Sequence, residues 1–221
     1  MILELPLTQL HRPADPLTQA PWLLVLLHGV GSNETDLFGL APAVPEQFHV
    51  VSLRAPFRLG PSAFGWFTFT VRADGHRMID AEQEMTSRTL LAQVISSAAG
   101  QLSVPAERVV VGGFSQGGIM SLSLLLTRPE LMAAALVMHS RLLPEVEQSI
   151  APAEQMRGRR LWVSHGTADT VMPLVNAHDI RDRVRKLPIE LSYAEFPGGH
   201  EIRPAELSGV TTWLNGLTAG S

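Results

Sequence analysis

The chain has 221 residues, of which 45% are hydrophobic and 17% charged, and it contains no cysteine. A chain of this length can bury an apolar core unaided, and the lack of cysteine excludes a thiol nucleophile, a disulfide scaffold and a Cys-ligated metal site. The formal net charge is −4, from 17 basic and 21 acidic residues, and the basic residues form no stripe. We therefore predict no nucleic-acid partner, because nucleic acid is bound by clustered Lys and Arg.

The sequence carries no evident targeting signal. Its N-terminal segment lacks a basic stretch followed by a long apolar run, and no segment approaches the length of about 18 uncharged apolar residues that a membrane span needs. We expect a single domain over residues 1–221, located in the cytoplasm, with no membrane span.

Short apolar runs alternate along the chain with segments of helical periodicity. Runs typical of strands buried on both faces occur at residues 22–27, 48–53, 109–111, 135–138, 161–164 and 189–196. The last run alternates in polarity, so we expect it nearer an edge of the sheet. Helical patterns occur at residues 85–102, 119–126, 177–187 and 207–217. This alternation predicts an α/β fold with a mostly parallel central sheet, helices on both faces, and ligand binding beyond the carboxyl ends of the strands.

A glycine-rich turn follows the strand predicted at residues 109–111. It contains Gly-x-Ser-x-Gly at Gly113, Ser115 and Gly117, and an apolar helix follows directly. A sharp strand-to-helix turn would hold the serine in a strained backbone conformation above the sheet, and glycines would let strand and helix approach closely. The alternatives are a phosphate-binding loop, although no Lys follows the glycines, and a structural turn. We predict that Ser115 is a nucleophile.

An activated serine needs a general base and an acid that orients the base, in the chain order serine, Asp or Glu, histidine. Asp169 follows the strand predicted at residues 161–164, and His200 follows the last predicted strand. The other candidates, Asp179, Asp182 and His178, fall within a predicted helix. We predict that Asp169 orients His200, which acts as the base. The alternative for Asp169 is a turn aspartate that caps its own backbone.

Ester hydrolysis also needs hydrogen-bond donors for the developing oxyanion. One is expected to be the backbone N–H of Gln116, which follows the nucleophile. The other should belong to a loop after an earlier strand, and we assign it to Val30 in the sequence His28-Gly29-Val30-Gly31. We expect His28 to close this loop by hydrogen bonds rather than to act as a second base.

With these residues the chain resembles the phospholipase/carboxylesterase family of small α/β-hydrolases, which includes acyl-protein thioesterases. The resemblance extends from about residue 22 to residue 214. Its motifs are residues 27–31 with Asp36, 54–56, 65–67, 113–118, 165–169 with Val171 and Pro173, and 199–202. It implies an α/β-hydrolase fold and a metal-free, cofactor-free serine enzyme that hydrolyses esters or thioesters, or in some members lysophospholipids. It also implies an apolar groove for the acyl chain and frequent homodimers.

From the residues and the resemblance together we expect a serine carboxylesterase that acts on a small-molecule ester through an acyl-enzyme. An acyl thioesterase or lysophospholipase with the same catalytic residues is the alternative among enzymes. A hydrolase-fold binding protein that has lost turnover is the alternative outside enzymes.

Two departures from the family pattern fall near the expected substrate site. The family usually has Ser-Gly after the sixth strand, where this chain has His139-Ser140-Arg141, and it continues Trp-Phe-Asp where this chain has Trp66-Phe67-Thr68. Arg141 is either a solvated arginine at a strand end or a fixed charge that selects an acidic acyl or leaving group.

Aromatic residues gather in one short segment that also contains Gly and Pro: Phe57, Phe64, Trp66, Phe67 and Phe69. They form either an acyl-binding wall or a hydrophobic cluster under a long loop. The candidate substrate-binding residues are Phe64, Trp66, Phe67 and Arg141.

Overall fold

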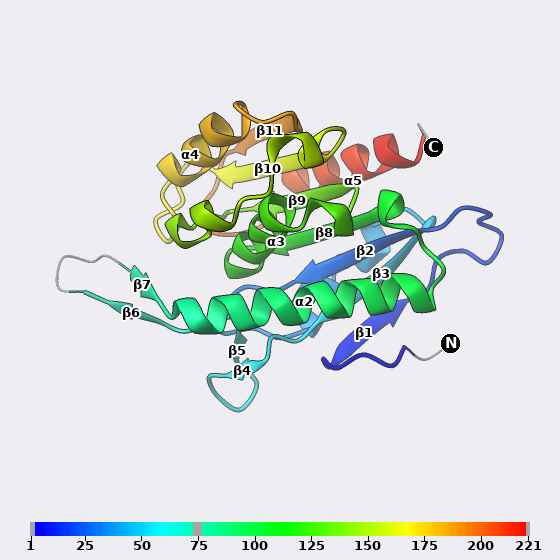
Figure 1. The fold of residues 1–221 in the computed structure, drawn as a ribbon, viewed down its shortest axis with the longest axis horizontal. Helices are drawn as coiled ribbons and strands as arrows, with labels where there is room; N and C mark the ends of the chain where they lie inside the picture. The colour runs from blue at the N-terminus through cyan, green and yellow to red at the C-terminus, as the bar shows by residue number, and fades with distance from the viewer. Residues whose placement is uncertain (1–2, 73–76, 220–221) are drawn as a thin grey trace.

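A seven-stranded sheet runs through the computed structural model, which describes residues 3–72 and 77–219 (Figure 1). In spatial order the strands are β1 (Gln9–Arg12), β3 (Phe48–Leu53), β2 (Trp22–Leu27), β8 (Val109–Phe114), β9 (Ala134–Met138), β10 (Arg160–Gly166) and β11 (Glu190–Phe196). Among these strands β1 pairs antiparallel with β3, and every other pair is parallel. The mostly parallel sheet predicted from the sequence is confirmed, and β11 lies at an edge, as its alternating pattern indicated.

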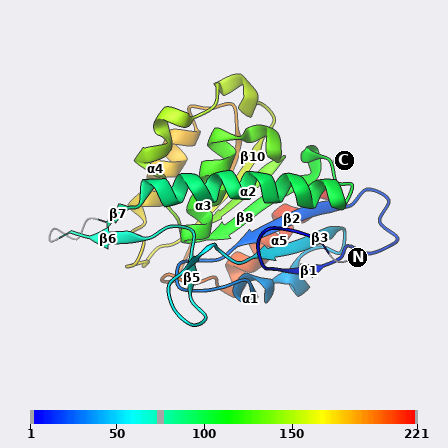
Figure 2. The ribbon, with the colours of Figure 1, turned by 60° about the horizontal axis from the view of Figure 1, so that its bottom comes forward.

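Helices cover both faces of the sheet. The helices α2 (Ala81–Gln101), α3 (Gln116–Thr127) and α4 (Val175–Val184) pack on one face, and α1 (Thr35–Phe38) and α5 (Pro204–Thr218) on the other (Figure 2). Successive side chains of a strand point to opposite faces. The residues of β2 accordingly alternate between the two hydrophobic clusters, and all six are buried. This double burial explains why the strand sequence is continuously apolar.

Smaller elements extend from the sheet. One hairpin pairs β4 (Phe57–Arg58) with β5 (Phe64–Gly65), and another pairs β6 (Phe69–Val71) with β7 (Arg77–Ile79). Short 3-10 helices lie at Ala41–Ala43, Ala106–Arg108, Pro129–Leu131, Pro144–Ser149 and Ala153–Met156. The arrows of β2 and β10 point to the side of the molecule from which the hairpin β6–β7 projects (Figure 1). The carboxyl ends of the parallel strands therefore meet on that side.

The sequence patterns did not predict β1 or the two hairpins. The four residues of β1 are all partly buried and include Gln, His and Arg, so they show no continuous apolar run. The hairpin strands are only two or three residues long. None of the helices in the described part of the chain has the length and apolar character needed to cross a bilayer.

Candidate active site

Ser115 lies in the turn between β8 and α3, at the carboxyl end of a central strand. Its backbone has φ 54° and ψ −116°, which is a strained conformation for a residue with a side chain. Two hydrogen bonds fix it: the Ser115 amide donates to the Met138 carbonyl at 2.9 Å, and the Ser115 carbonyl accepts from the Ile119 amide at 3.0 Å. The sharp turn expected from the sequence pattern is present.

Glycine is required on both sides of Ser115 because strand and helix nearly touch there. A Cβ on Gly113 would lie 2.2 Å from the Gly117 carbonyl carbon, and a Cβ on Gly117 would lie 1.8 Å from the Leu27 carbonyl oxygen. Both distances are far below a van der Waals contact. The expectation of close approach at these two positions is confirmed.

The structure brings Ser115, His200 and Asp169 into one hydrogen-bonded chain. His200 Nε2 lies 2.9 Å from the Ser115 hydroxyl, and His200 Nδ1 lies 2.7 Å from Asp169 Oδ2. Asp169 follows β10 and His200 follows β11, so three neighbouring loops supply the three groups. In this arrangement a neutral imidazole with its proton on Nδ1 has a lone pair on Nε2 facing the serine hydroxyl, which is the geometry of a general base.

Asp169 makes both kinds of contact that the sequence left as alternatives. Its Oδ1 accepts hydrogen bonds from the Val171 amide at 2.9 Å and the Met172 amide at 2.8 Å, so it does cap its own turn. Its Oδ2 faces His200 at the same time. Burial raises the pKa of Asp169, but hydrogen bonds from Met172, His200 and His139 outweigh burial and lower the pKa overall. The carboxylate therefore stays ionised beside the imidazole.

A buried histidine, His139, extends this chain beyond the partly buried His200, and the sequence patterns gave it no role. His139 is 1% exposed and has a φ of 49°. Its Nδ1 lies 3.0 Å from Asp169 Oδ2, its Nε2 lies 3.0 Å from Glu206 Oε2, and Glu206 Oε1 accepts from the Ser164 hydroxyl at 2.6 Å. Burial lowers the pKa of His139, but the hydrogen bonds and charges of Glu206 and Asp169 raise it overall. An imidazolium, which donates from both nitrogens, fits these two carboxylates.

His139, Asp169 and His200 are residue types that can bind a metal ion, and their candidate ligand atoms lie within 4.8 Å of one another. Asp169 Oδ2 is 3.0 Å from His139 Nδ1 and 2.7 Å from His200 Nδ1. Two ligands of a tetrahedral zinc ion, each about 2.0–2.2 Å from the metal, would lie about 3.3 Å apart or more. The observed distances are those of hydrogen bonds, so the cluster fits a proton-transfer site better than a metal site.

The predicted oxyanion donors border the same small cavity as the serine. The cavity measures about 30 Å³ and is bordered by Val30, Ser115 and Gln116. The rest of its lining consists of Phe67, Phe69, Arg77, Ile79, Ile119, Arg141 and Met172. In the part of the chain that the structure describes, neither the Val30 amide nor the Gln116 amide donates a hydrogen bond. Gln116 is also the first residue of α3, where backbone amides lack helical acceptors and the helix dipole favours negative charge.

Trp66, one of the expected substrate-binding residues, is not among the residues that line this cavity. Its side chain is fully buried, and its indole N–H donates to the His28 carbonyl at 2.9 Å. Its backbone amide donates to the side-chain oxygen of Gln116 at 2.8 Å, and the side-chain Nε2 of Gln116 donates to the Phe67 carbonyl at 2.6 Å. Trp66 therefore ties the loop before Val30 to the start of α3.

Phe64 and Phe67, the other two aromatic residues expected at the substrate site, differ in position. Phe64 is absent from the cavity lining, because it packs against the core beneath the guanidinium of Arg54, 4.7 Å from its ring centre. Phe67 does border the cavity, although it is only 2% exposed, and Phe69 borders it too. The aromatic segment thus divides into a packing part and a cavity-lining part.

His28 and His178, which the sequence analysis did not favour as the base, form hydrogen bonds elsewhere in the structure. His28 is buried; its Nδ1 donates to the Gly29 carbonyl at 2.7 Å, and its Nε2 accepts from the Ala55 amide at 3.0 Å. Burial lowers the pKa of His28 and so favours this neutral ring. The expectation that it closes the loop is confirmed. His178 lies on α4 and faces Glu195 at 2.9 Å.

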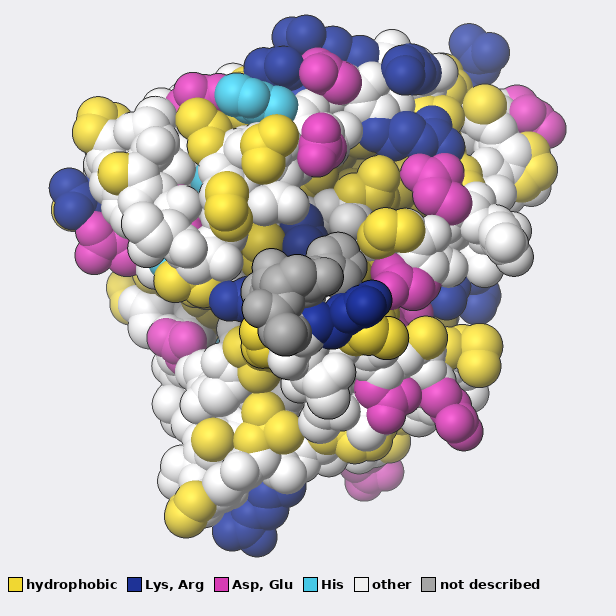
Figure 3. All heavy atoms as spheres, turned by 90° about the vertical axis from the view of Figure 1, so that its left-hand side faces the viewer, with side chains coloured by type: hydrophobic (Ala, Val, Ile, Leu, Met, Phe, Trp, Pro, Cys, Tyr) yellow, Lys and Arg dark blue, Asp and Glu magenta, His cyan; other side chains and the backbone are white. Residues whose placement is uncertain are grey.

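Arg141 is half-buried and lines two adjoining cavities. One is the cavity at Ser115, and the other, of about 390 Å³, is lined by Arg77, Arg141 and residues 170–173 with Asn176. Figure 3 views the molecule from the side to which the parallel strands point. Dark blue basic, yellow hydrophobic and magenta acidic side chains all lie near the middle of that face.

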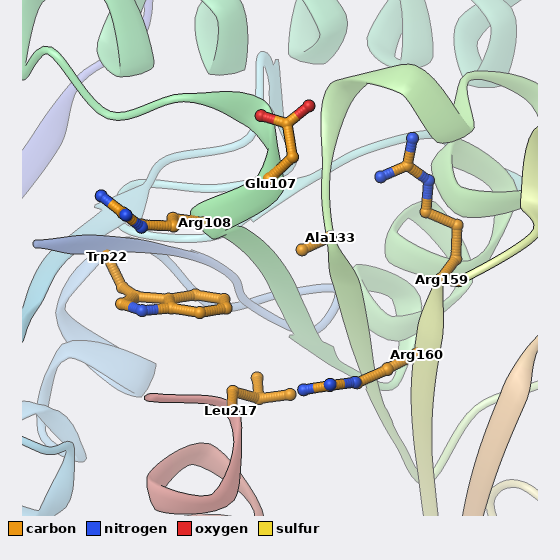
Figure 4. A pocket seen from close by; sticks show the side chains of 8 residues that line it. Trp22, Glu107, Arg108, Ala133, Arg159, Arg160 and Leu217 are labelled. Atoms are coloured by element: carbon orange, nitrogen blue, oxygen red, sulfur yellow. The ribbon is translucent and has the colours of Figure 1, made fainter. Parts of the chain in front are cut away.

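A further cavity lies at the opposite end of the sheet. It measures about 360 Å³, and its walls include Trp22, Arg108, Ala133 and Arg160, which stand at or just before the amino ends of β2, β8, β9 and β10 (Figure 4). Ligands of open α/β sheets bind beyond the carboxyl ends of the strands. The serine, the carboxylate and His200 gather at that other end.

Comparison with known proteins places this geometry in a family. The Phospholipase/Carboxylesterase family model matches residues 9–218. Acyl-protein thioesterase 1 of Neurospora crassa is 26% identical over 173 residues, covering 75% of this chain and 70% of the relative. The putative hydrolase MhqD of Bacillus subtilis is 24% identical over 193 residues, covering 86% of this chain and 91% of the relative.

Among solved structures, a carboxylesterase of Bacillus cereus is similar with a TM-score of 0.82 at 20% identity, covering 96% of this chain and 95% of that chain. At this identity the likeness establishes the α/β-hydrolase fold. The family model establishes more, because it matches nearly the whole sequence. The chain belongs to the Phospholipase/Carboxylesterase family.

Proposed function

We propose that this protein is a serine carboxylesterase with Ser115 as nucleophile, His200 as general base and acid, and Asp169 as the group that orients His200. The observation that carries the proposal is the pair of hydrogen bonds through His200, at 2.9 Å to the serine hydroxyl and 2.7 Å to the carboxylate. Family membership supports it independently. A hydrolase-fold binding protein would have no need of this alignment.

The reaction has two halves. In the first, the Ser115 oxygen bonds to the ester carbonyl carbon while His200 Nε2 accepts the hydroxyl proton, and the carbonyl oxygen becomes an oxyanion that the Val30 and Gln116 amides stabilise. His200 returns the proton to the alcohol oxygen as the carbon–oxygen bond breaks. In the second half, water attacks the acyl-enzyme, His200 takes its proton, and the acid leaves as the proton returns to Ser115.

Labelling with an uncharged fluorophosphonate tests whether the serine is activated, because only an activated serine reacts readily with this probe. We expect the wild type to be labelled and Ser115→Ala to be unlabelled, with a loss in kcat of about 10⁴- to 10⁶-fold on a short ester. Ser149→Ala is the matched control, because Ser149 is an exposed serine in the 3-10 helix Pro144–Ser149. Absence of labelling in the wild type would refute the proposal, and labelling that survives Ser115→Ala would refute the residue assignment.

A further inference from the structure

Two arginines border the reacting serine, and neither pairs with an acidic side chain in residues 3–72 and 77–219. Arg77 begins β7, and Arg141 follows β9 by three residues. Both line the cavity at Ser115 and also the adjoining cavity of about 390 Å³. The two cavities therefore share a wall that carries two fixed positive charges.

Neither guanidinium forms an ion pair or hydrogen bond with any residue that the structure describes. Arg77 instead lies over the ring of Phe69, 5.2 Å from its centre. Burial lowers the pKa of Arg141, and the positive charge of Arg77 acts in the same direction, opposed by Glu145. Glu145 is exposed and lines neither cavity, and no Asp or Glu is among the described residues that line them. Half-buried cations without a carboxylate are costly unless a ligand supplies the negative charge.

Several other arginines of this chain pair with acidic side chains. Arg54 pairs with Glu34 at 2.5 Å, and Arg183 pairs with Glu147 at 3.1 Å. Arg77 and Arg141 have no such pair among the described residues, and they differ from other half-buried arginines without an ion pair, Arg108 and Arg159, in lying beside the serine. The contrast favours a role in binding over a role in holding the fold together.

We propose that the site selects small esters that carry a carboxylate, which Arg77 and Arg141 bind while Ser115 attacks the ester carbonyl. This proposal rests on the proposed esterase function. The planar fork of arginine matches the two oxygens of a carboxylate. The volume of the adjoining cavity, about 390 Å³, is within the range of small-molecule sites.

The same lining indicates how the rest of such a substrate is held. Phe67, Phe69 and Ile119 provide an apolar surface beside the serine, while Thr170 and Asn176 provide polar groups in the adjoining cavity. A short hydrocarbon between the ester carbonyl and the carboxylate would follow this change from apolar to polar. A long acyl chain would instead have to pass two unpaired guanidinium groups, so long-chain thioesters and lysophospholipids fit the groove less well.

The test compares two esters that differ only near the distal end of the acyl chain, 4-nitrophenyl hydrogen glutarate and 4-nitrophenyl valerate. We expect the wild type to hydrolyse the glutarate ester with the higher kcat/KM. In the double variant Arg77→Gln/Arg141→Gln the ratio of the two kcat/KM values should fall about 10- to 100-fold, as expected for the loss of hydrogen bonds between charged groups. Arg141→Lys keeps the positive charge but not the planar fork of arginine, so its ratio of the two kcat/KM values should lie between those of the wild type and the double variant.

Two further measurements make the interpretation unambiguous. Arg185→Gln is the control for net charge, since Arg185 is 65% exposed at the far end of α4 and should leave the ratio unchanged. A second substrate pair, 3-carboxy-4-nitrophenyl butyrate and 4-nitrophenyl butyrate, places the carboxylate on the alcohol side instead. A preference in either pair that depends on the arginines supports the proposal, and the pair that shows it identifies the side.

The experiments distinguish a failure of the proposed anion selection from a failure of the proposed esterase function. If wild-type Ser115 reacts with the uncharged fluorophosphonate and the neutral esters are hydrolysed, but neither carboxylate ester is preferred, the selection of anions is wrong and the esterase function stands. The same conclusion follows if a preference exists but survives in the double variant. If nothing is labelled and no ester is hydrolysed, the esterase function itself is wrong.

Discussion

Replacing Glu206 by Gln tests the charge of the buried pair that Glu206 forms with His139. In the wild type both ring nitrogens of His139 lie 3.0 Å from carboxylate oxygens, which an imidazolium satisfies. Glutamine has nearly the same shape as glutamate; it can donate to a neutral ring and still accept from the Ser164 hydroxyl. We expect Glu206→Gln to fold normally with a neutral His139 that keeps its Nδ1 proton toward Asp169.

The size of the effect follows from the hydrogen bond that changes. A hydrogen bond to a charged group contributes about 1.5–3 kcal/mol and a neutral one about 0.5–1.5 kcal/mol, so the free energy of unfolding should fall by about 1–2 kcal/mol. At this chain length each kcal/mol lowers Tm by about 2–4 °C. Because the pair is buried, solvent screens the effect little.

The stability difference between wild type and Glu206→Gln should depend on pH, and the pKa of His139 determines in which direction. Burial lowers the pKa of His139, but Glu206 and Asp169 raise it above its ordinary value overall. The stabilisation is therefore complete below the unfolded-state pKa, about 6.5, and is lost as pH rises through the raised folded-state pKa. The stability difference between wild type and Glu206→Gln should be largest near about pH 6 and smaller near about pH 9.

Urea unfolding of both proteins at the two pH values measures this difference. Glu130→Gln is the matched control, because Glu130 pairs with Arg128 on the surface, where both side chains are about half exposed, and the loss should stay below about 1 kcal/mol at either pH. An equal stability difference at both pH values, or none at all, would refute the buried charge. Turnover of a neutral ester should fall less than about tenfold, since the hydrogen bond to Asp169 persists.

Three further predictions concern the site and its support. Gly117→Ala should abolish folding or lower the free energy of unfolding by more than about 4 kcal/mol, since its Cβ would lie 1.8 Å from a backbone oxygen. Gly100→Ala is the control and should be tolerated, because no atom lies within 4 Å of its Cβ. Soluble yield and urea unfolding compare the two variants. Trp66→Phe removes the indole donor to the buried His28 carbonyl, and should lower the free energy of unfolding by about 1–3 kcal/mol; an unchanged urea midpoint would contradict the tie. Asp169→Asn should lower kcat by about 10⁴-fold in ester turnover, and a loss below tenfold would mean that another group orients the base.

Much of the fold could be predicted because helices cover both faces of the sheet. That double burial requires continuous apolar runs, and it leaves a visible signal in β2 and in β8. The turn at Ser115 was equally visible, because close packing permits only glycine at two fixed positions around it. The edge strand β1 gave no such signal, since its residues are only partly buried.

The buried partners of Asp169 could not be predicted in the same way. His139 and Glu206 are 67 positions apart in the sequence, and their meeting depends on how α5 packs across the sheet. The available hints were a histidine where the family usually has a small residue and a glutamate in the first turn of an apolar helix. The burial of Trp66 away from the cavity could not be predicted for a related reason: composition marks an aromatic residue but not the direction in which its ring points.

The side chain of Gln116 helps to order the site before any substrate binds. It holds the backbone of Trp66 and Phe67, while the indole of Trp66 holds the His28 carbonyl two residues before Val30. The two amides that we propose as oxyanion donors, those of Val30 and Gln116, are thus joined through one set of buried hydrogen bonds that forms when the chain folds. Under this proposal a substrate meets donors that are already in position, so its binding energy is not needed to assemble them.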